Sequence, residues 1–93
     1  MENSIIEYRE CLKAVFEIHI DKLHIVEASL AQGDKRKELL SFSKDFNRKS
    51  IEKGNGIKNK FQSCSKDLKS DLRNALSEIY SEYYDKFQIE LAA

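Results

Sequence analysis

The sequence predicts an all-α fold, an antiparallel bundle of three long helices forming a single helical domain over residues 1–93. One observation is the absence of proline and the presence of only three glycines in 93 residues, which leaves long stretches free to be helical. The other is that apolar residues recur at steps of three and four along segments that the glycines separate. These segments are about 4–32, 35–53 and 57–91.

The first segment, 4–32, opens with Ser4 and Glu7 in the Ser-x-x-Glu spacing of a capping box. Gly33 predicts the end of this helix, because glycine takes a positive φ without cost, and Asp34 is a good N-cap for the next helix. One face of the segment carries apolar residues and a histidine at helical spacing: Ile5, Tyr8, Leu12, Val15, His19, Leu23, Val26 and Leu30.

The second segment, 35–53, is the shortest and most polar, with a narrow apolar face around Phe42 and Phe46. Gly54-Asn55-Gly56 predicts the second turn, because all three residues tolerate left-handed conformations. The third segment, 57–91, has the most regular spacing, close to an eleven-residue repeat. Such a repeat predicts coiled-coil-like packing that is straight or slightly right-handed.

The three predicted helices differ in length, so they cannot cover one another from end to end. At a rise of 1.5 Å per residue they would be roughly 43, 28 and 52 Å long, so the aromatic end of the third helix would extend beyond the second. That end could fold back as a fourth helix, pack against a second copy, or bind another protein, and of these we expect a homodimer. The residues of this predicted protein interface are Ile5, Tyr8, Ile79, Tyr80, Tyr83, Tyr84, Phe87 and Leu91.

Charge is distributed in blocks although the net charge is zero. Residues 1–34 carry three basic and seven acidic side chains, residues 35–73 carry twelve and five, and residues 74–93 carry one and four. The basic centre predicts, as an alternative function, a small nucleic-acid-associated protein that contacts phosphates at the tip between the second and third helices. The residues expected to make these contacts are Arg48, Lys49, Lys53, Lys58 and Lys60.

Catalytic chemistry is not indicated. His19 lies on the apolar face, which favours a hydrogen-bonded core or interface role. His24 shares one helix face with Glu17 and Asp21, but acid–histidine pairs of the di-iron type need partners from further helices. No glycine-rich phosphate loop is present. We therefore expect a protein that is not an enzyme and has no metal site and no cofactor.

Compartment follows from the cysteines and the hydropathy pattern. Cys11 and Cys64 form no CxxC pair, which favours free thiols in a reducing compartment, and no apolar run is long enough to span a membrane. A cytoplasmic location is expected. Together these observations predict a non-enzymatic protein–protein interaction module of the adaptor, inhibitor or chaperone type.

Overall fold

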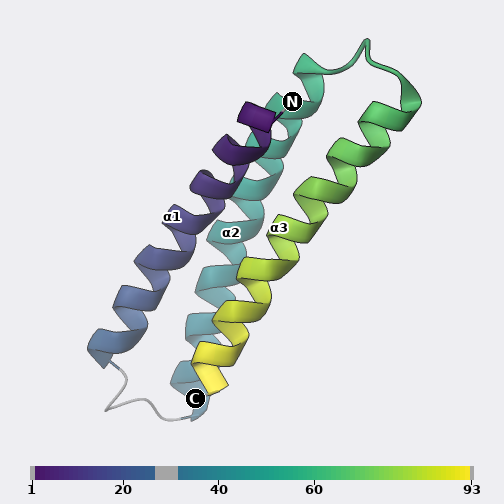
Figure 1. The fold of residues 1–93 in the computed structure, drawn as a ribbon. Helices are drawn as coiled ribbons and strands as arrows, with labels where there is room; N and C mark the ends of the chain where they lie inside the picture. The colour runs from purple at the N-terminus through teal and green to yellow at the C-terminus, as the bar shows by residue number, and fades with distance from the viewer. Residues whose placement is uncertain (1, 27–31, 93) are drawn as a thin grey trace.

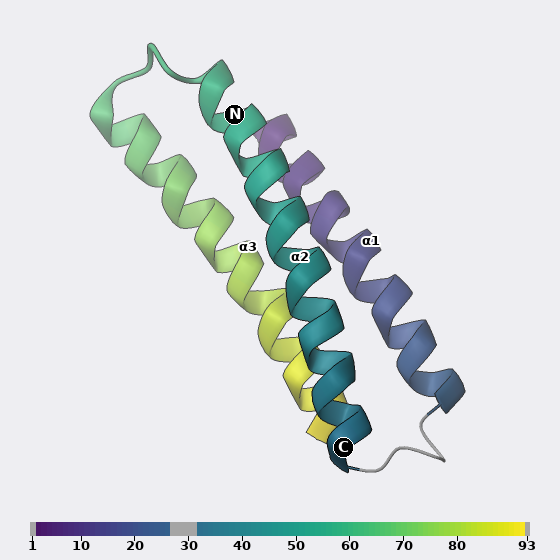
Figure 2. The same cartoon turned by 180° about the vertical axis from the view of Figure 1, so that it is seen from behind.

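A computed structural model describes residues 2–26 and 32–92 and shows three antiparallel helices (Figure 1). The helices are α1 (Glu2–Val26), α2 (Gln32–Lys60) and α3 (Lys66–Ala92). Each helix packs against the other two in a rod of 51 × 17 × 16 Å. The start of α1 lies beside the turn between α2 and α3, and the view from behind shows the C-terminus at the opposite end (Figure 2). The predicted all-α bundle of three helices is confirmed.

Both predicted breaks are wrong in position. The predicted end of the first helix at residue 32, and the break at Gly33 and Asp34, lie in the first turn of α2, and residues 27–31 lie outside the described part of the chain. Gly54-Asn55-Gly56 lies within α2, and no described glycine has a positive φ. The reason is tertiary packing. Gly54 is buried, and an added Cβ there would lie 3.7 Å from Cε2 of Tyr8 on α1.

The connection between α2 and α3 instead covers residues 61–65. Backbone hydrogen bonds of 3.2 Å run from the Phe61 amide to the Lys58 carbonyl and from the Cys64 amide to the Phe61 carbonyl. Ser65 then caps α3, since its Oγ accepts a hydrogen bond from the Leu68 amide at 3.3 Å. Asp67 in the first turn of α3 adds a favourable interaction with the helix dipole.

The length mismatch predicted from the sequence is therefore absent. The three helices have 25, 29 and 27 residues, so α2 covers the whole of α1 and α3. The last helix is continuous from Lys66 to Ala92, so the alternative in which it breaks and folds back is wrong. The sequence predicted uncovered helix ends only because the predicted second helix stopped at Lys53, whereas α2 continues to Lys60.

The core is built around stacked aromatic rings. Phe42 lies between Phe46 and Phe87, with ring centroids 4.8 and 4.0 Å away, and all three side chains are fully buried. Burying each such ring contributes roughly 1.5–3 kcal/mol relative to exposure. Leu12 and Ile57 extend the same core toward the turn between α2 and α3.

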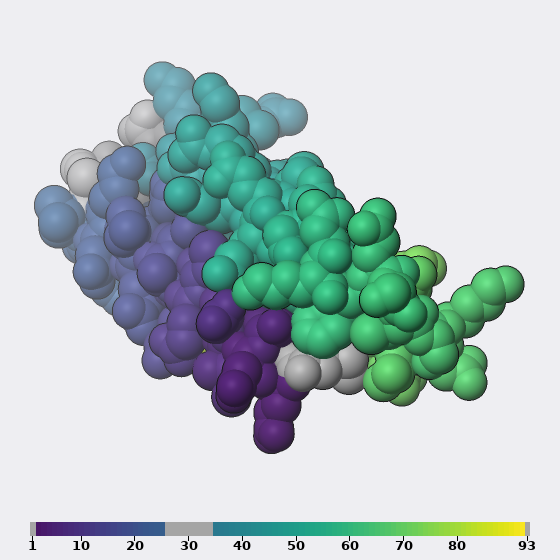
Figure 3. All heavy atoms as spheres, turned by 90° about the horizontal axis from the view of Figure 1, so that it is seen from above, coloured from purple at the N-terminus to yellow at the C-terminus, as the bar shows by residue number. Residues whose placement is uncertain are grey.

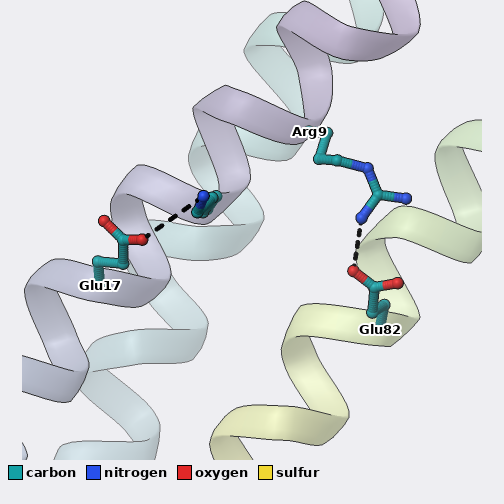
Figure 4. Close-up of polar contacts among 4 residues, drawn as sticks. Arg9, Glu17 and Glu82 are labelled. Carbon is teal, nitrogen blue, oxygen red and sulfur yellow. Dashed lines mark hydrogen bonds and ion pairs between the residues drawn. The ribbon is translucent and has the colours of Figure 1, made fainter.

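One ion pair joins α1 to α3 across the surface. The Arg9 guanidinium donates a hydrogen bond to Glu82 at 2.6 Å, whereas Lys13 and Glu17 interact within α1 at 4.0 Å (Figure 4). A hydrogen bond to Tyr83 and the contact with Glu82 raise the pKa of Arg9 above its ordinary value. All four charged side chains are well exposed, so each pair contributes only about 0.2–1 kcal/mol.

Candidate functional site

The eight aromatic and aliphatic residues predicted to form a protein interface pack within the bundle itself. Four of them are buried in the bundle core: Tyr8, Ile79, Tyr83 and Phe87. The other four are half-buried and pack against that core: Ile5, Tyr80, Tyr84 and Leu91. The structure thus removes the uncovered end from which this interface was predicted, while self-association itself stays a prediction.

Two of these half-buried residues fix α3 against α2. The Tyr80 hydroxyl donates a hydrogen bond to the Asn47 side chain, and Tyr84 shares a hydrogen bond of 2.9 Å with Ser43. The two tyrosine rings stack with centroids 5.7 Å apart. Because these two hydrogen bonds hold one side of α2 against α3, they also determine which face of α2 points outward.

The five predicted phosphate contacts do not gather at one tip. They are distributed over Arg48 to Lys60, more than three turns of one helix. Lys53 is paired with Glu7 of α1 at 3.5 Å, and Arg48 lies 3.6 Å from Asp45 on its own helix. Lys49 lines a shallow hollow against Cys11 of α1. Only Lys58 and Lys60 lie in the last turn of α2.

A different arrangement of cations appears once α2 runs to Lys60. Seven exposed residues follow one another at steps of three or four along its outer face, and we call them the α2 stripe. Its members are Lys37, Leu40, Lys44, Arg48, Ile51, Asn55 and Lys58. The stripe contains four cations and no acid, and it extends over about 32 Å at 1.5 Å per residue. Its two aliphatic side chains, Leu40 and Ile51, are 64% and 61% exposed.

The outer faces of the neighbouring helices carry the opposite charge. Each has a row of four exposed acids at helical spacing. On α1 the row is Glu7, Glu10, Glu17 and Asp21. On α3 it is Asp67, Asp71, Glu78 and Asp85. Along most of α2 the positive surface is therefore one helix wide and flanked by negative rows, whereas near the turn to α3 it continues onto Lys69 and Arg73.

The spacing of the α2 stripe is present in the sequence, but the turn wrongly predicted at Gly54-Asn55-Gly56 divides it between two segments. A helix ended at Lys53 leaves Asn55 and Lys58 out of register with Lys37, Leu40 and Lys44. Moreover, Leu40 and Ile51 are apolar, so they are naturally expected in a core. Only the positions of Phe42 and Phe46, which bury the opposite face, show that both aliphatics point to solvent.

The structure buries His19, for which the sequence favoured a hydrogen-bonded core or interface role. Its side chain is 2% exposed and lies edge-on to the rings of Phe42 and Phe87. Its Nε2 lies 3.0 Å from Oδ2 of Asp45, and Nδ1 has no hydrogen-bond partner among the described residues. No reactant in solution reaches this ring, so the arrangement supports a structural contact between α1 and α2.

Groups of three or more metal-ligating side chains do not occur within residues 2–26 and 32–92. Within the same ranges, none of the helices is long and apolar enough to span a membrane. No protein-family model, no curated protein and no solved structure matches this chain.

Proposed function

We propose that this chain is a non-enzymatic protein-interaction module that binds an acidic helical surface of another protein through the α2 stripe. The observation that carries the proposal is the exposure of Leu40 and Ile51 within a row of four cations. Apolar contacts surrounded by charge are the usual anatomy of an interface, because the apolar contacts give affinity and the charges give orientation and specificity.

The geometry favours a narrow partner. Leu40 and Ile51 are eleven residues apart, about 16 Å along the helix, which matches three turns of a second helix lying alongside. A partner helix with apolar residues at that spacing and acids beside them would complement the stripe. Burying both aliphatic side chains would supply roughly 1.5–3 kcal/mol each, enough to change affinity by at least about tenfold.

Broad anionic surfaces fit less well. A membrane-binding helix presents a wide apolar face, whereas Lys44 and Arg48 separate the two aliphatic residues here. A duplex or a membrane would also bring phosphates close to the acidic rows of α1 and α3, and this repulsion opposes binding. The predicted nucleic-acid function therefore remains the alternative, supported only by the positive charge of α2.

A second copy of the chain is one source of an acidic helical surface, since the α1 row has the right charge and carries exposed Ile18 and Ile25. The homodimer predicted from the sequence would then form between α1 of one copy and the α2 stripe of the other, rather than through the end of α3. A reducing compartment such as the cytoplasm is proposed as the location, supported by the free Cys11 and Cys64.

The test uses synthetic helical peptides of about 25 residues, long enough to cover the stripe. One carries acids and two leucines eleven residues apart, the second replaces the leucines by glutamine, and the third is residues 2–26 of this chain. Binding is measured by fluorescence anisotropy at low and moderate salt. We expect the first to bind at least about tenfold more tightly than the second.

Matched variants locate the contact. Lys44→Glu and Leu40→Ser should each weaken binding of the first peptide, whereas the equally exposed controls Lys22→Glu and Ile89→Ser should not. Equal weakening by a control, or equal binding of the first two peptides, would refute the proposal. Tight binding of the third peptide, together with a dimer by light scattering that Lys44→Glu disrupts, would identify the partner as a second copy.

A further inference from the structure

Two adjoining hollows lie between α2 and α3 near the turn that joins them, the end of the molecule that Figure 3 views from above. The larger holds about 320 Å³ and the smaller about 230 Å³. Lys58 of α2 and Arg73 of α3 line both, and Lys69 lines the smaller one. Among the residues that the structure describes, none that lines either hollow is acidic.

The three cations are placed unfavourably for a protein without a ligand. Lys69 and Arg73 are four residues apart on α3, a like-charge spacing that costs a helix a few tenths of a kcal/mol. Lys58 faces them from α2. None of the three has an acidic partner within 4.0 Å among the ion pairs of the described residues. An anion between them would relieve this repulsion.

The walls of the larger hollow are mixed. Ile51 and Tyr80 form its apolar walls, and the almost fully buried Tyr8 and Leu76 lie at its base. The exposed Ser77 and Ser81 provide hydroxyl groups, whereas the buried Ser50 hydroxyl already donates to the Asn47 carbonyl at 2.9 Å. A volume near 300 Å³ is at the small end of ligand pockets, so it suits a single ring rather than a large cofactor.

We propose that these hollows bind a small phosphate monoester whose ring lies against Tyr8 and Tyr80 while its phosphate is held by Lys58, Lys69 and Arg73. Arginine pairs with carboxylate and phosphate alike through two parallel hydrogen bonds. Phosphate is the favoured anion here because the double charge of a phosphate monoester can interact with several cations at once. This site shares Ile51, Asn55 and Lys58 with the α2 stripe, but it depends on Lys69 and Arg73, which lie outside the stripe, so it can be tested separately from the function proposed above.

The experiment is a titration of the ¹⁵N-labelled protein with phenyl phosphate, followed by amide chemical shifts at neutral pH. We expect saturable shifts on both walls, at Asn55 and Ser77 among others. Inorganic phosphate should bind at least about tenfold more weakly because it lacks the ring. Phenol should bind more weakly still, since it lacks the charge.

Variants distinguish a built site from general attraction to a basic surface. Arg73→Gln and Lys69→Gln should each weaken phenyl phosphate binding several-fold, about tenfold for Arg73. Arg36→Gln removes an exposed arginine of α2 that lies outside both the hollows and the α2 stripe, and it should leave binding unchanged. Unaltered melting temperatures would show that the variants remain folded.

Several outcomes would overturn the proposal. They are the absence of saturable shifts, equal affinity for phenyl phosphate and inorganic phosphate, or equal loss of binding in Arg36→Gln. Much tighter binding of a single-stranded oligonucleotide than of phenyl phosphate would replace the small ligand by a nucleic acid. Failure of the peptide experiment leaves this site unaffected, because its test uses Arg73 and Lys69 rather than Leu40 and Lys44.

Discussion

Replacing Gly56 by alanine tests whether α2 really continues through the glycine pair. Gly56 is exposed, lies inside α2, and has no atom within 4 Å of the position that a Cβ would occupy. No described glycine has a positive φ, so alanine meets no backbone strain. The substitution should therefore show the full difference in helix propensity between the two residues.

That difference is about 1 kcal/mol in a helix interior, and we expect about 0.5–1 kcal/mol because Gly56 is near the end of α2. For a domain of this size, 1 kcal/mol raises the melting temperature by roughly 4–8 °C. Urea and thermal unfolding followed by circular dichroism measure both quantities. If Gly54-Asn55-Gly56 formed the turn predicted from the sequence, alanine at Gly56 would instead lower stability. A continuous helix and a turn therefore predict stability changes of opposite sign.

Two further variants control the experiment. Gly54→Ala should gain a similar amount, because its Cβ would make an ordinary contact of 3.7 Å with Tyr8. Ala14→Gly in the exposed middle of α1 should lose about as much as Gly56→Ala gains. A loss of stability in Gly56→Ala, with the expected loss in Ala14→Gly, would refute a continuous α2.

Two more predictions concern stability. Phe42→Ala removes the ring at the centre of the aromatic stack and should lower the free energy of unfolding in urea by about 3–5 kcal/mol. The control Leu40→Ala, at an exposed position, should lower it little. Similar losses in the two variants would contradict the aromatic stack as the core. Burial raises the pKa of Tyr8 above its ordinary value of 10.0, with a hydrogen bond to Ser50 offsetting part, and burial likewise raises the pKa of Tyr80. The unfolded chain then ionises these phenols at lower pH than the folded chain, so stability is full below about pH 10 and falls as pH rises through the folded pKa values. Tyr8→Phe and Tyr80→Phe together should flatten this alkaline fall relative to the parent protein, and an unchanged slope in urea midpoints would contradict it.

The class of fold could be read from the sequence, because it depends on properties that are local in the chain. The lack of proline and the spacing of residues such as Leu12, Phe42 and Ile79 require helices wherever those residues lie. The serine that caps α3 was also available, since Ser65 followed by Asp67 is a helix-start pattern. The candidate surfaces were harder to predict from the sequence, because assigning a side chain to the core or to solvent requires the correct helix boundaries.

By itself, the sequence determined that this protein is a helical bundle with a basic centre between acidic segments. Only the tertiary structure decided where α2 ends, because the packing of Tyr8 over Gly54 and the burial of Ile57 outweigh the roughly 1 kcal/mol that each glycine costs a helix. The same packing decides that the aromatic end of α3 fills the core and that Leu40 and Ile51 face solvent. A local preference of this size is easily reversed, since burying one large apolar side chain contributes more.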